Sequence, residues 1–157
     1  MNPLKVTKEN LGVNSPIPLE VLKDDPAVIQ RFADDLMYEY QAAKNAGRQK
    51  VVFIIPVGPV GQYDIWAERC NAEGVGLNDL VLINMDEYLT VDSQSFIPLT
   101  DPLSFRNHMQ VHFFSKLAPE LAPPPEQLMF PDPKDPGAVP RAVAHYGGCD
   151  VCFGGIG

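Results

Sequence analysis

The chain has 157 residues, of which 45% are hydrophobic, and its formal net charge is −8 at pH 7. This length and composition are enough for one folded domain with a substantial core. The acidic charge argues against nucleic acid or an anionic membrane as a partner, although backbone dipoles can still bind a small phosphate.

The sequence contains no recognisable signal peptide and no membrane-spanning segment, because its apolar runs are too short for either. The cysteines are few and odd in number: Cys70, Cys149 and Cys152. Such usage predicts reduced thiols and a cytoplasmic protein.

Residues 1–24 are predicted to form an extended arm, since prolines interrupt them and little periodicity is present. A strand at Leu4–Val6 and a helical turn at Leu19–Leu22 are alternatives within the arm. Residues 25–157 are predicted to form the rest of a single α/β domain.

The first helix is predicted over Pro26–Ala46. Asp25 suits the N-cap, and Gly47 suits the C′ position. Apolar residues recur at i, i+3 and i+4 spacing and predict one buried face, made of Ile29, Phe32, Ala33, Leu36, Met37 and Tyr40.

Two apolar runs enclose a second predicted helix. One lies in Lys50–Pro56, and the other opens Leu80–Tyr88 and ends at the carboxylates Asp86 and Glu87. Both are short and partly β-branched, as is typical of buried parallel strands. Between them a glycine loop leads into a helix over Gln62–Glu73, with one face made of Tyr63, Trp66 and Cys70. This order predicts a βαβ unit.

Four further elements are predicted beyond this unit. The first is a helix with Asp101 as N-cap and Pro102 at its first position, which runs to about Leu117. The others are a strand at Gln127–Phe130, a helix at Ala138–Tyr146 and a strand at Cys149–Phe153.

The turn at Pro56–Gly61 precedes a helix, so its backbone N–H groups could cradle a phosphate. Its glycines match neither the P-loop nor the dinucleotide-binding pattern, and an ordinary tight turn is the alternative. Asp86 and Glu87 follow the strand at the edge where parallel sheets bind ligands. They predict either a general base acting beside a carbonyl or a structural acid that caps the next segment or pairs with a basic residue.

His108 and His112 have the i, i+4 spacing of metal ligands, but Met109 replaces the acid of the H-E-x-x-H pattern. We expect both to face core or solvent, with no metal site. Cys149 and Cys152, on a predicted strand, are expected to be buried as small apolar residues on opposite faces.

A parallel sheet needs helices on both faces, yet no helix follows the last predicted strand. We therefore expect these residues to be the N-terminal part of an incomplete domain.

Three segments resemble the glucosamine-6-phosphate deaminase (isomerase) family, and the resemblance covers about Lys50–Gly157. Asn84–Tyr88 matches its N-M-D-E-Y signature, and Ser104–Leu117 is similar to the helix that follows this signature there. Gly147–Gly157 is similar to its G-G-I-D-L-F-L-G-G-I-G strand and turn. The related 6-phosphogluconolactonases share the fold.

The resemblance implies a Rossmann-like α/β sandwich, often homo-oligomeric, that converts glucosamine 6-phosphate to fructose 6-phosphate and ammonia without a cofactor. It implies that Asp86 is the catalytic base. Asn84 and Glu87 are expected to help position the loop around it. The alternatives are a lactonase, another sugar isomerase, or a non-catalytic sugar-binding or regulatory protein. The expected substrate contacts are Gly58, Pro59, Val60, Gly61, Glu87, Gly155 and Gly157.

The chain departs from the family pattern in two places. The family loop reads P-T-G-(G/S)-T-P-x-G-x-Y, whereas here the loop is two residues shorter, Val57 replaces a threonine, and Pro59 has no N–H. A divergent member with an altered substrate is therefore expected. The family's D-G-H-I segment, with the ring-opening histidine, follows its G-G-I-G and is not present here, so this chain alone is expected to be inactive.

Overall fold

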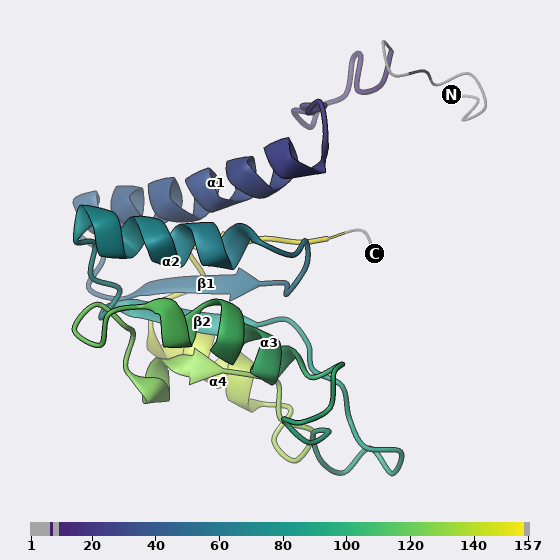
Figure 1. Cartoon of the computed structure of the whole chain (residues 1–157), viewed down its shortest axis with the longest axis vertical. Coiled ribbons are helices and arrows are strands. Elements are labelled where there is room, and N and C mark those ends of the chain that lie inside the picture. The colour runs from purple at the N-terminus through teal and green to yellow at the C-terminus, as the bar shows by residue number, and fades with distance from the viewer. Residues whose placement is uncertain (1–6, 8–9, 156–157) are drawn as a thin grey trace.

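The computed structural model describes residues 7 and 10–155, and these form an α/β fold (Figure 1). The four strands pair in the order β3-β2-β1-β4, and every pair is parallel. This confirms the α/β class and the predicted β1-α2-β2 unit. The strands are β1 (Val51–Ile55), β2 (Leu80–Asn84), β3 (Leu128–Met129) and β4 (Val151–Cys152). The helices are α1 (Asp25–Asn45), α2 (Gln62–Glu73), α3 (Phe105–His112), α4 (Ala138–His145) and the 3₁₀ turns η2 (Phe114–Lys116) and η3 (Pro125–Gln127).

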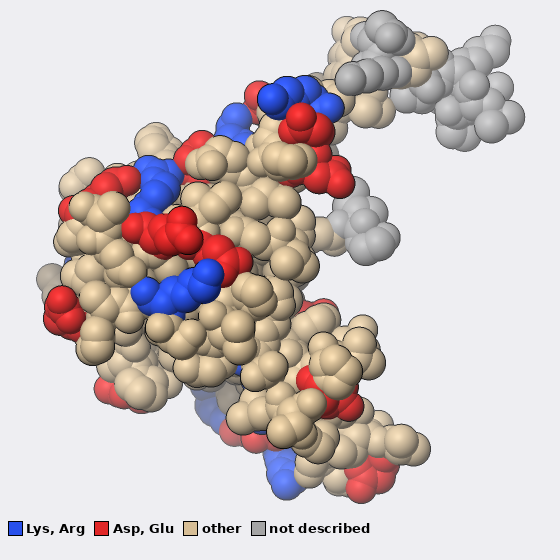
Figure 2. Space-filling model, in the orientation of Figure 1, with Lys and Arg blue, Asp and Glu red and all other residues tan. Residues whose placement is uncertain are grey.

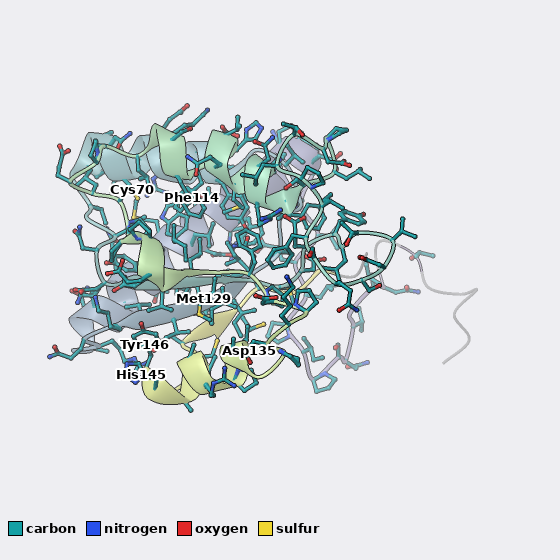
Figure 3. All side chains as sticks on the ribbon, turned by 90° about the horizontal axis from the view of Figure 1, so that it is seen from below. Cys70, Phe114, Met129, Asp135, His145 and Tyr146 are labelled. Carbon is teal, nitrogen blue, oxygen red and sulfur yellow. The ribbon has the colours of Figure 1, made fainter. Side chains whose placement is uncertain are left out.

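The sheet is the middle of three layers, with α1, α2 and α3 on one face and α4 on the other (Figure 3). Alternate residues of β1 separate the two interfaces, because side chains along a strand point to opposite faces. Phe53 packs with Trp66 and Phe113 on the three-helix side. Val52 packs toward α4 and Tyr146, on the side where Figure 3 places Met129.

The predicted first helix is confirmed as α1, but its cap differs by one residue. Asp24, not Asp25, is the N-cap, and its carboxylate accepts a hydrogen bond from the Ala27 N–H at 2.9 Å. Asp25 lies in the first turn, where an acid stabilises the helix through its dipole. Gly47 follows the helix with φ of 88°, as expected of a C′ glycine.

The predicted helix start at Asp101 is wrong. The Asp101 side chain accepts a hydrogen bond from Leu103 N–H at 2.9 Å, and this local turn competes with helix formation. Helix α3 starts at Phe105, with Ser104 as N-cap, and ends at His112.

Residues 10–24 form no helix or strand, and most of them project from the body of the fold (Figure 1). The alternative of a helical turn at Leu19–Leu22 is therefore wrong, and the alternative strand at Leu4–Val6 lies outside the described residues. The other predicted elements are present, although the last two strands are shorter than expected. No helix in the described part of the chain is both long and apolar enough to cross a membrane.

The prediction that Cys149 and Cys152 are buried is wrong, because both are exposed. Cys149 precedes β4 and its Sγ lies 3.2 Å from the carbonyl oxygen of Val151. β4 is the last strand of the sheet on its side, so less protein covers it than covers the central strands. Cys70 is buried on α2, like Tyr63 and Trp66 of the same predicted face, and burial raises its pKa to about 12.

Candidate functional site

The carboxyl ends of β1, β2 and β4 meet at one edge of the sheet. The chain runs from β1 to β2 on one side, whereas β4 joins β1 on the other side, so the order reverses between β1 and β4. In open parallel sheets, ligands bind outside the strand ends at this reversal. The β1 arrow in Figure 1 points to this side, and Figure 2 shows the molecule hollowed there.

The glycine loop that follows β1 lies at this reversal. The Gln62 side chain donates to the carbonyl oxygen of Val57 at 3.0 Å, and the Tyr63 hydroxyl donates to that of Pro56. Both residues are fully buried, so they anchor the loop to the start of α2. Gly61 is the N-cap of α2 with φ of 115°, a backbone conformation that residues other than glycine rarely adopt.

The loop leaves backbone donors unused at the N-terminus of α2. No side chain caps this helix, and among the described residues the N–H groups of Gly58, Val60 and Gly61 donate to no protein acceptor. A helix N-terminus with free N–H groups attracts an anion. Pro59 lacks an N–H, so the loop offers one donor fewer than its length allows.

A cavity of about 510 Å³ brings the predicted base beside this loop. Asp86 is exposed, and its carboxylate accepts no hydrogen bond from any described residue. It is therefore open to a ligand. The residues that line the cavity are Pro56, Val57, Gly58, Pro59, Met85, Asp86, Phe105 and Gly155.

A second cavity, of about 320 Å³, lies on the α1 side of the same loop. It shares Pro56, Gly58, Pro59 and Gly155 with the first cavity, so the two are neighbours across the strand reversal. Most of its other walls are apolar, and its full set adds Leu22, Val28, Arg31, Phe32, Asp35, Phe153 and Gly154.

The predicted site residues are only partly brought together. Gly58, Pro59 and Gly155 share the cavity with Asp86, whereas Val60 is exposed at 62% and does not line it. Gly157 lies outside the described residues. Sequence reasoning missed Met85 and Phe105, the apolar walls, because an apolar residue in a loop or at a helix start carries no signal of its own.

Glu87 has a different environment from Asp86. Its side chain is fully buried, and its carboxylate accepts hydrogen bonds from the N–H groups of Tyr88, Phe105 and Arg106 at 2.8–2.9 Å. Burial acts to raise the pKa of Glu87, but these three N–H donors and the Arg106 guanidinium outweigh it and lower the pKa. Every contact of this carboxylate is internal, so substrate binding by Glu87 stays a prediction.

Asn84 ends β2 and is buried. Its amide nitrogen lies 3.5 Å from the carbonyl oxygen of Met129, at the limit of a hydrogen bond, and its oxygen has no partner among the described residues. This contact joins the end of β2 to β3, and the role of Asn84 in positioning the loop stays a prediction.

The two histidines of α3 lie away from this cavity. Their rings stack with centroids 4.3 Å apart, both are half-buried, and burial lowers the pKa of His108. His112 Nδ1 lies 3.0 Å from the carboxylate of Asp64, which Lys116 also contacts at 2.5 Å. The described residues contain no group of three ligands that could hold a metal ion. The contacts of His112 and Lys116 with Asp64 join α2 to α3 and η2.

The parallel sheet and its strand reversal define a Rossmann-like α/β fold, with a cavity at the place where such folds bind ligands. The chain matches no protein-family model and no curated protein.

Among solved structures, the chain is similar to a monomeric glucosamine-6-phosphate deaminase described as a missing link of the NagB superfamily. The TM-score is 0.55 and the sequence identity is 16%. The similarity covers 83% of this chain and 48% of that chain, so this chain spans about half the length of that enzyme. At this identity, the likeness supports the fold and not a particular reaction.

Proposed function

We propose that this chain forms the base-bearing part of an isomerase/deaminase that acts on an amino-sugar phosphate. The observation that carries the proposal is the position of Asp86. Its carboxylate is exposed, pairs with no described residue, and lies just after β2 in one cavity with the glycine loop. The fold neighbour and the N-M-D-E-Y resemblance support the same reaction class.

The proposed reaction uses Asp86 as a proton shuttle. The open-chain sugar has an aldehyde at C1 and an amine at C2, so the carbonyl makes the C2 proton acidic. Asp86 removes this proton and returns it to C1, while the C1 carbonyl oxygen takes up a proton from solvent and becomes a hydroxyl. This leaves an iminium at C2. Water adds to C2 and ammonia leaves, which yields the ketose. The loop amides beside the α2 N-terminus receive the phosphate.

Ammonia release from glucosamine 6-phosphate by the product of the complete gene tests the proposal. We expect Asp86→Asn to lower kcat by about a thousandfold or more, because the base is lost while the shape is kept. Asp25→Asn, which replaces an exposed acid on α1, is the matched control and keeps full activity. Unchanged activity of Asp86→Asn would overturn the role of Asp86, and a wild-type protein that binds the sugar without releasing ammonia would favour a sugar-binding function.

A second candidate substrate is an unphosphorylated amino sugar. The cavity is lined by apolar groups and one carboxylate, and its described lining includes no lysine, arginine or histidine. Val57 also offers no hydroxyl to a phosphate. Glucosamine, glucosamine 6-phosphate and 6-phosphogluconolactone, compared by kcat/KM, separate the two substrates and the lactonase alternative. Cytoplasmic location and homo-oligomer formation stay predictions.

A further inference from the structure

Two adjacent acids at the end of β2 are held in opposite ways. Asp86 is exposed and makes no hydrogen bond with any described residue, whereas the Glu87 side chain is fully buried and accepts five. In addition to three backbone N–H groups, Glu87 accepts from the Ser104 hydroxyl at 3.1 Å and from Arg106 Nε at 3.0 Å. The position of Asp86 is therefore set by its neighbours in the chain.

Arg106 connects Glu87 to the far end of the loop that follows β2, residues 85–97. It donates through a second nitrogen to the carbonyl oxygen of Ile97, and its guanidinium lies 4.6 Å from the ring centroid of Phe96. The loop also pairs with itself, because Ile97 N–H donates to Tyr88 O at 3.0 Å. One side chain of α3 thus contacts both ends of the loop.

The other side of Asp86 is fixed by the sheet. Met85 N–H donates to the carbonyl oxygen of Ile55 at 2.9 Å, which extends the pairing of β2 with β1 past Asn84. Asp86 is the one residue between this strand contact and the buried Glu87. Its backbone has little freedom to move while both neighbours are held.

We propose that Arg106 is a positioning residue, which holds Asp86 at the cavity through the buried carboxylate of Glu87. The catalytic part of this inference rests on the proposed function of Asp86, and the structural part does not. Arg106 itself does not line the cavity, so it acts through Glu87 and not by touching the substrate. Arginine suits this place, because its planar fork serves two acceptors and stacks on an aromatic ring.

The test uses Arg106→Met, Arg106→Lys and a matched control, Arg69→Met, in the product of the complete gene. Arg69 on α2 has similar exposure, 33% against 25% for Arg106, and also pairs with acids, Glu73 and Asp34. Hydrogen exchange of peptides covering residues 85–97 reports the loop without any substrate. The kcat and KM for ammonia release are measured in the wild-type and Asp86→Asn backgrounds.

We expect Arg106→Met to speed exchange in residues 85–97 by about tenfold, with α1 and β1 unchanged, and Arg69→Met to leave the loop as in the wild type. We expect kcat to fall about tenfold or more while KM changes by less than about threefold, because a displaced base affects the reaction more than binding. Arg106→Lys keeps the charge but loses the planar fork, so its exchange rate and kcat should lie between those of the wild type and Arg106→Met. In the Asp86→Asn background, Arg106→Met lowers the remaining kcat by less than about twofold.

Wild-type exchange rates in Arg106→Met, if the variant is folded, contradict the positioning role. So does a faster-exchanging loop with unchanged kcat, or an equal loss of kcat with and without Asp86. If Arg106→Met does not fold, Arg106→Lys decides by the same measurements. If the wild-type protein releases no ammonia, the proposed function fails, and loop exchange alone then supports or overturns the Arg106–Glu87 contact.

Discussion

At the scale of single residues, Asp86 and Glu87 show how neighbouring carboxylates take different roles. Asp86 faces a cavity and keeps its acceptor capacity for a ligand. Glu87 occupies the N-terminus of α3, where backbone N–H groups and the helix dipole favour its charge. The sequence places both acids at the strand end, and only their surroundings separate a candidate base from a structural acid.

Asp86→Asn should leave stability almost unchanged, because the side chain is exposed and has no partner in the part of the chain that the structure describes. We expect the free energy of unfolding to change by no more than about 0.5 kcal/mol. Urea unfolding measures it. A loss above about 1 kcal/mol would show that Asp86 has a structural role and that its effect on activity is indirect.

Glu87→Gln should destabilise the protein in a pH-dependent way. The pKa of Glu87 is lowered from 4.5 in the folded state, so its charge stabilises the fold above the unfolded-state pKa and this contribution is lost as pH falls through the folded-state pKa. We expect a loss of about 1–3 kcal/mol at pH 7, since buried N–H donors lose a charged acceptor. The difference from wild type, measured by urea unfolding, should shrink below pH 4.5. If wild type and Glu87→Gln differ in unfolding free energy by the same amount at pH 7 and at pH 3, the stabilising role of the Glu87 charge is contradicted.

At the scale of elements, the starts of α1 and α3 depend on which side chain lies close enough to accept hydrogen bonds from their first N–H groups. The periodicity of α1 and the glycine after it predict the helix, but either of two adjacent aspartates could cap it. For α3, part of the N-terminal acceptor set comes from Glu87, which is distant in sequence. Local pattern reading therefore placed its start at Asp101, three residues before the observed cap, Ser104.

Asp24→Ala should cost about 1 kcal/mol of stability, because the Ala27 N–H loses its acceptor at the start of α1. Asp25→Ala is the matched comparison, and it should cost only a few tenths of a kcal/mol, since Asp25 acts through the helix dipole. Thermal and urea unfolding of both variants measure the difference. Equal losses would show that the two acids share the cap.

At the scale of the whole molecule, the two faces of the sheet differ in the size of the hydrophobic cluster that each one buries. The three-helix side contains a large cluster with Phe53, Trp66 and Phe113 at its centre. On the other side, the short α4 covers only Val52, Val81 and Ile83 as fully buried residues. The stability of the described part of the chain therefore depends mainly on the three-helix side.

Phe53→Ala should reduce stability by about 3–5 kcal/mol, because it opens a cavity in the larger cluster. Val143→Ala on α4 should cost about 1 kcal/mol or less, since this side chain is only half-buried. Urea unfolding of the two variants compares the faces. A larger loss from Val143→Ala would place the main stabilising contacts on the α4 side.

The sequence by itself determined the order of elements, because hydrophobic period and turn residues act locally: the βαβ unit, α4 and the acidic end of β2 were all predicted. It also predicted Asp86, Gly58, Pro59 and Gly155 as site residues, which line one cavity.

Tertiary structure alone decided what depends on distant partners. It placed Phe105 in the cavity wall, exposed Cys149 and Cys152 at the edge of the sheet, and enclosed Glu87 with Arg106. The physical reason is that burial and hydrogen bonding are properties of the packed chain, in which residues far apart in sequence supply the walls and the partners.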